Sequence, residues 1–189
     1  MRKLESILSI VAMGLVSGVA SAQPKEEAAK PVAAAEPVKA PEGPPRPAPE
    51  MAQYKMLLGN WKCTGKMSMM GKEAETSGTY KAAVAHNGFW VVAQMTSSAK
   101  GMPGKYTGTD IYGWDPQQKQ YVMYSIDNMG GSGAMMSKGW EGDKQEWTGK
   151  AQMMGQMMDM KQTVTKKSDK ETAITGDGGG MHYEMTCKK

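Results

Sequence analysis

The sequence predicts an all-β fold, an antiparallel up-and-down β-barrel of about 8–10 strands with a short N-terminal helix or turn. Two observations predict it. Apolar and polar residues alternate through 106–114 and again through 121–127, and a polar, proline-containing turn at 115–119 separates these stretches. This pattern is typical of a β-hairpin. Similar alternating segments separated by turn residues continue to the C-terminus.

The alternation assigns side chains to opposite faces of each strand. In segments 61–69, 77–86, 145–153 and 181–188, one face carries apolar or small residues and the other carries mostly Lys, Thr, Ser and Glu. Half-buried antiparallel strands have this pattern. A sandwich is the alternative to a barrel, but glycines on the inward face suit the bends that closure requires, at Gly65, Gly78, Gly108 and Gly149. Residues 49–58 are expected to form the short helix or turn.

The two cysteines agree with a closed barrel. Cys63 lies on the first predicted strand and Cys187 on the last, both on the inferred inner face. In an up-and-down barrel with an even number of strands, the first and last strands pair antiparallel. We therefore expect a Cys63–Cys187 disulfide, which an exported location would favour. Two free buried thiols are the alternative.

The chain is predicted to have three parts. Residues 1–22 resemble a signal peptide, with Arg2 and Lys3 before a short apolar run and a small-residue cleavage pattern ending at Ala22. Residues 23–50 hold eight of the ten prolines and no apolar periodicity, as expected of a flexible Pro/Ala-rich linker. Residues 51–189 form the β-barrel domain. The expected location is outside the cytoplasm, periplasmic or extracellular.

Composition argues against several classes of function. The formal net charge is only +4 and lysines alternate with acids, so there is no basic stripe that would bind nucleic acid. No second apolar run follows the signal, so no membrane span is expected after its cleavage. The chain has two histidines, and both cysteines are expected to pair, so a catalytic triad is hard to assemble. We therefore expect a protein that is not an enzyme and has no cofactor; its oligomeric state stays open.

Several motifs together resemble one bacterial family. Gly59-Asn60-Trp61 opens the domain, Gly104 to Gly108 leads to Gly113-Trp114-Asp115, and Ile126 to Met129 follows. These segments resemble the family called domain of unknown function 1579, which is similar to lipocalin-like, calycin-type barrels. Trp114 stands where the family usually shows Tyr, and Ser125 where it usually shows Trp. The resemblance implies the barrel fold and no particular activity.

A small apolar ligand held inside the barrel is the expected role. The inward aromatic and methionine side chains would give an adaptable apolar lining. Asp127 shares their face and could be a carboxylate inside the barrel, although a strand-end Asp that caps its own turn is the alternative. The predicted ligand-binding residues are Trp61, Tyr80, Met123, Asp127, Trp147 and Tyr183.

Methionine suggests a second role. Of 20 methionines, all but Met1 and Met13 follow the signal, whereas the remaining chain has two leucines and one phenylalanine. Methionine can replace leucine as core filling. Segment 153–160 is expected to be a hairpin with Gly155-Gln156 at its tip, which would place Met154 opposite Met157 as an exposed thioether pair. Thioethers favour Cu(I), so copper binding is the alternative function. Oxidation buffering and a structural envelope module with a filled barrel are further alternatives.

Overall fold

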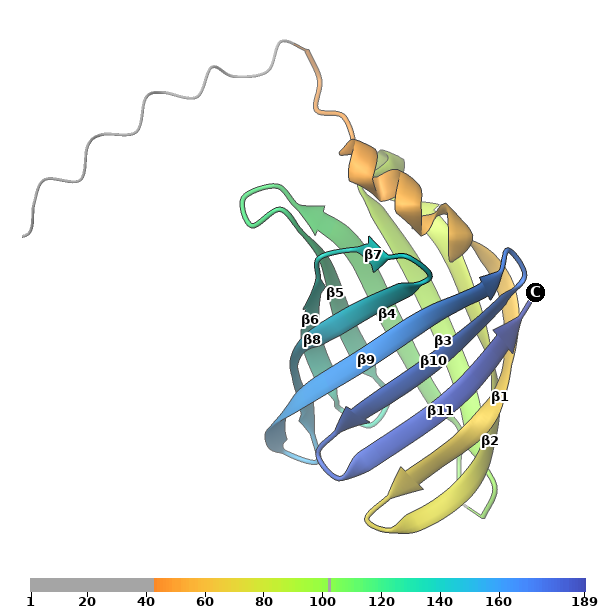
Figure 1. The fold of residues 1–189 in the computed structure, drawn as a ribbon. Helices are drawn as coiled ribbons and strands as arrows, with labels where there is room; N and C mark the ends of the chain where they lie inside the picture. The colour runs from red at the N-terminus through yellow and green to blue at the C-terminus, as the bar shows by residue number, and fades with distance from the viewer. Residues whose placement is uncertain (1–42, 102) are drawn as a thin grey trace, which may run out of the picture. The chain divides into compact units, whose positions relative to one another are not determined.

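The computed structural model describes residues 43–101 and 103–189. The expected signal peptide (1–22) and most of the expected linker (23–50) lie outside the described residues. The elements are two 3₁₀ helices and eleven strands (Figure 1): η1 (Pro49–Met56), β1 (Gly59–Met69), β2 (Lys72–Ala85), η2 (His86–Gly88), β3 (Trp90–Ala99), β4 (Tyr106–Asp115), β5 (Gln120–Asp127), β6 (Ser132–Ser137), β7 (Trp140–Glu141), β8 (Lys144–Met153), β9 (Gln156–Ser168), β10 (Glu171–Gly178) and β11 (Met181–Lys188).

Consecutive strands pair antiparallel around a closed ring. The order runs from β1 to β6 by neighbouring hairpins, β6 then pairs with β8, and β8 to β11 continue to β1. The two-residue β7 pairs with β8 outside the ring. Ten strands therefore form an up-and-down barrel, which confirms the predicted fold class. Closure removes the exposed sheet edges at which aggregation begins.

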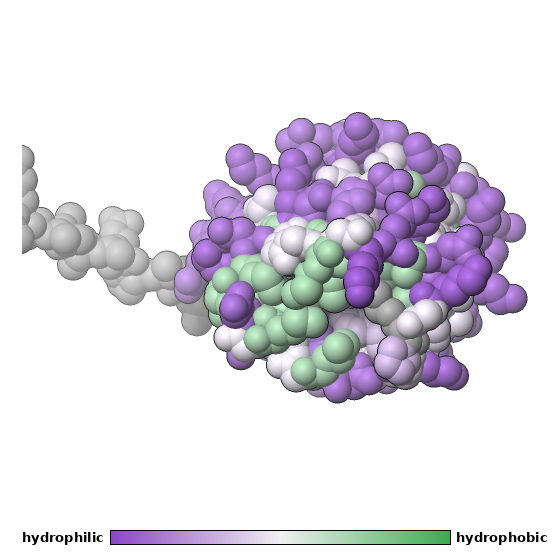
Figure 2. Space-filling model, turned by 90° about the horizontal axis from the view of Figure 1, so that it is seen from below, coloured by the Kyte–Doolittle hydropathy of each residue, from purple (hydrophilic) through white to green (hydrophobic). Residues whose placement is uncertain are grey.

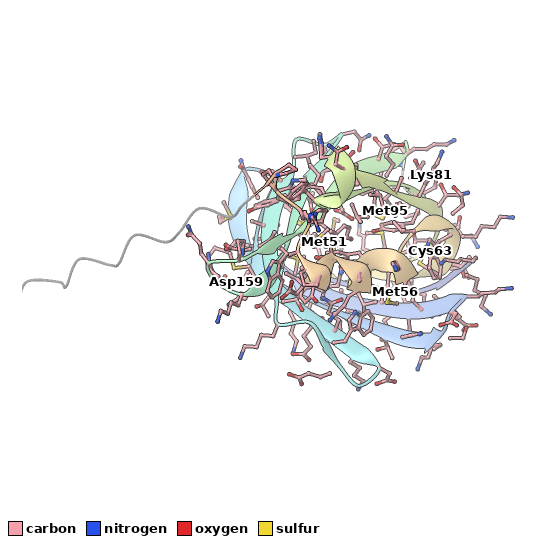
Figure 3. All side chains as sticks on the ribbon, turned by 90° about the horizontal axis from the view of Figure 1, so that it is seen from above. Met51, Met56, Cys63, Lys81, Met95 and Asp159 are labelled. Atoms are coloured by element: carbon pink, nitrogen blue, oxygen red, sulfur yellow. A yellow bond between two sulfur atoms is a disulfide. The ribbon has the colours of Figure 1, made fainter. Side chains whose placement is uncertain are left out.

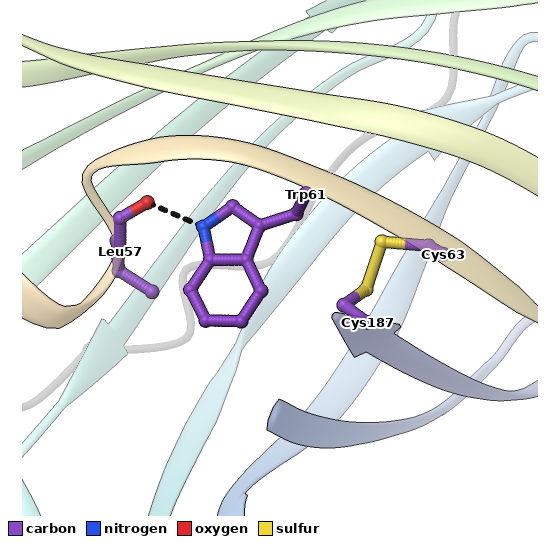
Figure 4. The surroundings of a disulfide bond; sticks show 4 residues. All are labelled: Leu57, Trp61, Cys63 and Cys187. Atoms are coloured by element: carbon purple, nitrogen blue, oxygen red, sulfur yellow. Dashed lines mark hydrogen bonds between the residues drawn. A yellow bond between two sulfur atoms is a disulfide. The ribbon is translucent and has the colours of Figure 1, made fainter. Parts of the chain in front are cut away.

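The two cysteines join the ends of the ring. Cys63 on β1 lies directly opposite Cys187 on β11, and the two sulfurs form a disulfide with an S–S distance of 2.01 Å (Figure 4). Both side chains are buried, in a small cluster with Trp61. The predicted disulfide is confirmed, and it links positions that are 124 residues apart in sequence.

The central hairpin forms as the alternation predicted. Strands β4 and β5 pair from Gly108 with Asp127 to Asp115 with Gln120. The turn is capped by the Asp115 carboxylate, whose Oδ1 accepts hydrogen bonds from the backbone N–H groups of Gln117 at 2.8 Å and Gln118 at 3.1 Å. A short polar side chain that bonds its own backbone two residues on stabilises such turns.

Inward glycines mark places where neighbouring strands approach closely. A Cβ atom added to Gly65 would overlap the carbonyl oxygen of Glu184, and one added to Gly149 would overlap that of Ala134. Both glycines therefore permit a backbone approach that any side chain would block. This supports the sequence argument that preferred a barrel to a sandwich.

The helix η1 lies across one end of the barrel (Figures 1 and 3). Its Tyr54 is 3% exposed and packs on Tyr112 and Tyr121, with ring centroids 5.4 and 5.5 Å away. The Tyr54 hydroxyl donates a 3.1 Å hydrogen bond to the carbonyl oxygen of Gly113 on β4. The expected short helix thus covers one end; we call this the η1 end.

The β8–β9 hairpin differs from the prediction by its register. Met153 pairs with Gln156 and Gln152 pairs with Met157, so Met154 and Gly155 form the tip. The predicted tip Gly155-Gln156, with Met154 opposite Met157, is wrong. In a two-residue turn of this kind both central residues adopt positive φ. Met154 has φ 50° and Gly155 has φ 78°, so this turn accepts a non-glycine residue at its first position.

Candidate functional site

All six predicted ligand-binding residues face the barrel interior, but they divide into two groups. Trp61, Met123 and Trp147 are 3%, 4% and 1% exposed, so neighbouring side chains cover them almost completely. Tyr80, Asp127 and Tyr183 keep part of their surface accessible. The first group therefore belongs to the packed core, and the second is only partly buried.

The packed core occupies the interior towards the η1 end. Trp147 contacts Tyr112 edge to face, with centroids 5.9 Å apart. The Trp61 indole N–H donates to the carbonyl oxygen of Leu57 at 2.8 Å, which ties β1 to the residue that follows η1 (Figure 4). Buried aromatic rings with satisfied polar atoms stabilise a fold strongly. Aromatic rings fill much of this part of the interior, together with aliphatic residues and the buried methionines Met123 and Met135.

Beyond this core, several inward-facing side chains are enclosed by the barrel wall and still keep accessible surface. Cross-strand pairing places them on the inner face: Tyr80 lies opposite Met95, and Ile174 lies opposite Met185. Figure 3, viewed from the η1 end, shows Met95 within the ring and Lys81 outside it. Six of the residues that share this partial accessibility are Tyr80, Met95, Asp110, Gln162, Ile174 and Tyr183. We call them the lumen residues.

Asp110 is the functional candidate that the sequence interpretation missed. It lies on β4 between Gly108 and Tyr112, opposite Ala93 on β3 and Ser125 on β5, so its side chain faces inward. Its Oδ2 accepts a 3.3 Å hydrogen bond from the Tyr112 hydroxyl, which itself accepts a 3.0 Å bond from the Tyr80 hydroxyl. The same alternation that placed Gly108 and Tyr112 inside also places Asp110 there, so the signal was available.

Burial changes the protonation of these groups. Desolvation raises the pKa of Asp110 above its ordinary range, while hydrogen bonds from Ser125 and Tyr112 act in the opposite direction. Burial likewise raises the pKa of Tyr80 and Tyr112, and the nearby Asp110 adds to the shift. These tyrosines therefore remain neutral hydrogen-bond donors, and Asp110 is the group whose charge can change.

Asp127 has a structural role at the end of β5. Its Oδ1 accepts 2.8 Å hydrogen bonds from the backbone N–H groups of Met129 and Gly131, and Tyr106 donates to its Oδ2 at 3.4 Å. This is the turn-capping arrangement that was the alternative interpretation of Asp127. Because its oxygens already accept three hydrogen bonds, Asp127 has less capacity for a ligand than Asp110.

Tyr183 and Gln162 lie opposite the Asp110 side of the ring. The Tyr183 hydroxyl donates a 2.7 Å hydrogen bond to Oε1 of Gln162 on β9. Burial raises the pKa of Tyr183, and Asp110 contributes to that shift, so the two side chains lie within electrostatic range. Polar groups thus converge on the lumen from β2, β4, β9 and β11.

Two open hollows lie on the outer wall, not in the lumen. Both are centred on Gly65 and are lined mainly by outward polar residues such as Thr64 and Lys66; their volumes are about 580 and 370 Å³. Ion pairs flank them, including Lys66 with Glu73 at 2.8 Å and Lys100 with Glu75 at 3.5 Å. These are exposed pairs of small energetic value, and we assign the hollows no role.

The end opposite η1 presents methionine. Met70, Met129 and Met154 lie at the tips of three hairpins there and are 77%, 71% and 68% exposed. Figure 2, viewed from this end, shows apolar surface surrounded by hydrophilic residues. We call these three residues the methionine rim. Met157, 63% exposed, lies opposite Gln152 and not opposite Met154.

The described part of the chain contains no cluster of three or more His, Cys, Asp or Glu side chains that could hold a metal ion. Within the same residues, no helix is long and apolar enough to span a membrane.

Comparison with known proteins identifies the family. A family model described as a protein of unknown function, DUF1579, matches residues 46–186. The chain belongs to the DUF1579 family. The match covers the barrel from η1 to β11, which confirms the resemblance seen in the sequence motifs. No curated protein matches this DUF1579 chain in sequence.

Solved structures similar to this DUF1579 protein are barrels with very different sequences. Rv2717c from M. tuberculosis aligns with a TM-score of 0.59 at 11% identity, over 76% of this chain and 99% of that one. The S-type phycobiliprotein lyase CPES from Guillardia theta gives 0.48 at 5% identity, over 76% and 98%. The redesigned barrel mFAP0 bound to DFHBI gives 0.44 at 9% identity, over 71% and 100%. Identities this low show likeness of fold alone.

Proposed function

We propose that this DUF1579 protein is an exported, non-enzymatic carrier that binds a small, largely apolar ligand in the barrel lumen. The observation that supports the proposal is the partial accessibility of side chains enclosed by the wall. Side chains packed to the usual interior density would have lost that accessibility. Apolar residues with a few convergent polar groups are the usual composition of a ligand site.

The location is part of the proposal. The expected signal peptide precedes a barrel whose ends are joined by an oxidised disulfide. Disulfides persist mainly in oxidising compartments outside the cytoplasm. We therefore place the protein in the periplasm or outside the cell, with residues 23–50 as a tether between the cleavage site and the barrel.

The experiment compares ligand occupancy in two tryptophan variants. The full mature chain is purified from the cell envelope and studied by native mass spectrometry, and bound small molecules are extracted. Met95→Trp adds bulk inside the ring, whereas Lys81→Trp adds the same side chain outside it (Figure 3). In native mass spectra we expect Met95→Trp to lose the bound small molecule and Lys81→Trp to keep it. Equal occupancy in both variants, or no bound molecule in any, contradicts the proposal and favours the filled structural module.

Copper binding is the second candidate function, and the exposure of the Met154 and Met157 thioethers supports it. Soft thioether sulfurs select Cu(I). The double variant Met154→Leu plus Met157→Leu should then lose Cu(I) affinity in a competition titration under reducing conditions. Met136→Leu, on the outer wall of β6, is the matched control. Unchanged affinity in the double variant excludes this pair as a copper site. If these methionines instead protect the protein by being oxidised themselves, the unmodified protein should not bind Cu(I).

A further inference from the structure

The charges of the lumen have one sign. Along the inward positions of the described strands, the acidic residues are Asp110 and Asp127. Two lysines share the inward register, and both lie exposed at strand ends. Lys166, opposite Thr172 near the end of β9, pairs with Asp169 at 2.7 Å, and Lys72, opposite Met69, begins β2. The lumen therefore contains carboxylates without an enclosed cation to balance them.

Asp110 is the carboxylate that remains available. The Asp127 carboxylate already accepts hydrogen bonds from two backbone N–H groups and from the Tyr106 hydroxyl. Asp110 accepts hydrogen bonds from the Tyr112 hydroxyl, at 3.3 Å, and from Ser125, which lies opposite it on β5, and it keeps accessible surface. The tyrosines that lie within electrostatic range of it, Tyr80, Tyr106, Tyr112 and Tyr183, are neutral donors because burial raises their pKa. None of these groups supplies a positive charge.

An enclosed carboxylate is costly unless a cation or several hydrogen bonds accompany it. A ligand that carries its own positive charge would remove this cost by pairing with Asp110. Apolar lumen residues accompany it: Met95 is the next inward residue on β3 after Ala93, the buried residue opposite Asp110. An alkyl or aromatic body would contact Met95 while its charged end reaches Asp110.

We propose that the ligand is a lipophilic amine, an elongated apolar molecule whose ammonium group pairs with the Asp110 carboxylate in the lumen. The inference rests on the proposed function, because it assumes that the lumen admits a ligand. Asp110 determines specificity here by its charge, and the Tyr80 and Tyr112 hydroxyls hold its carboxylate in position through the two hydrogen bonds described above.

The test uses three probes with the same apolar chain and different charge: octylamine, octanol and octanoate. Each is titrated calorimetrically into the full mature protein at neutral pH. We expect octylamine to bind about tenfold or more tightly than octanol, the gain expected for a hydrogen bond between charged groups. Octanoate should bind more weakly than octanol, because like charges repel.

Two variants test whether Asp110 causes the preference for octylamine over octanol. Asp110→Asn should abolish the preference, so that this variant binds octylamine and octanol with similar affinity. Asp159→Asn removes an exposed carboxylate that pairs with Lys150 and is the matched control, with the octylamine preference retained (Figure 3). Circular dichroism checks that each variant folds. If Asp110→Asn does not fold, the ranking of the three probes on the unmodified protein still decides the inference.

The outcomes separate the two proposals. Binding of all three probes with similar affinity overturns the amine inference and leaves lumen binding in place. An octylamine preference that survives Asp110→Asn also overturns it, because the charge would then lie elsewhere. Binding of none of the probes, together with no bound molecule in the envelope preparation, overturns both.

Discussion

The Tyr54 hydroxyl and the Gly113 carbonyl oxygen form a buried 3.1 Å hydrogen bond across 59 residues of sequence. This contact fixes η1, which precedes the barrel in the chain, to β4 near the C-terminal end of that strand. It also places the Tyr54 ring over Tyr112 and Tyr121, so the η1 end is filled by aromatic side chains. The opposite end has hairpin tips and the methionine rim instead. The two ends of the barrel therefore differ, and the proposed ligand would enter at the methionine rim.

Removing the Tyr54 hydroxyl should destabilise the fold. Tyr54→Phe leaves the buried Gly113 carbonyl without its donor, and such a change costs about 1–3 kcal/mol. Chemical denaturation measures the free energy of unfolding. Tyr124→Phe is the control, because Tyr124 lies on the outer wall and is 46% exposed. Equal losses in the two variants would show that the Tyr54 hydrogen bond contributes little.

Removing the disulfide should have a larger effect. The double variant Cys63→Ala plus Cys187→Ala frees a loop of 124 residues, for which the chain-entropy model gives about 5 kcal/mol of lost stability. Urea denaturation of both proteins measures the difference. The control is the double variant Thr64→Ala plus Thr186→Ala, which changes the adjacent cross-strand pair on the same two strands and leaves the disulfide intact. If the cysteine variant unfolds at the same urea concentration as this control, the disulfide does not stabilise the closure of the barrel.

A side chain at Gly149 should strain the β6–β8 contact that closes the ring. The added Cβ of Gly149→Ala would overlap the carbonyl oxygen of Ala134 and approach the Cα of Met135. Overpacking of this kind costs about 1–3 kcal/mol. The neighbouring outward residue offers the control Thr148→Ala. Thermal melts measure the Tm of each variant. If Gly149→Ala and Thr148→Ala both melt at the Tm of the unmodified protein, Gly149 is not required for the close contact between β6 and β8.

The stability should depend on pH through Asp110. Burial raises the pKa of Asp110 above its ordinary value of 3.8, so the folded state binds this proton more tightly than the unfolded state. The resulting stabilisation is fully present below the unfolded-state pKa and is lost as pH rises through the folded-state pKa. The free energy of unfolding of the unmodified protein, relative to Asp110→Asn, should therefore fall as pH increases from about 4.

The contributions of other titratable groups to the pH dependence cancel when the two proteins are compared. Hydrogen bonds to Asp177 and Glu184 raise the pKa of His182 above 6.5, so its contribution is also lost at higher pH, but it is present in both proteins. Denaturation at several pH values between acid and neutral measures the difference directly. A difference that is constant with pH would mean that Asp110 titrates as an ordinary exposed carboxylate.

The alternation of residues was enough to determine most of the fold. It assigned inner and outer faces, and with an even number of strands it brought Cys63 opposite Cys187. It could not determine depth along the barrel axis. Trp147 and Tyr183 share the inner face, yet Trp147 is 1% exposed while Tyr183 keeps accessible surface, because η1 and its aromatic contacts fill only one end.

The tertiary structure alone decided the hairpin register at the rim and the surroundings of the acids. The predicted and the observed β8–β9 registers both keep Gly149, Ala151 and Met153 on the inner face, and only the observed pairing of Met153 with Gln156 places Met154 and Gly155 at the tip. Asp110 was on the inner face by the same rule, but its enclosure among Tyr80, Tyr112 and Ser125 depends on three different strands. A pattern within one strand specifies the face of a side chain, and only the packing of neighbouring strands specifies what that side chain contacts.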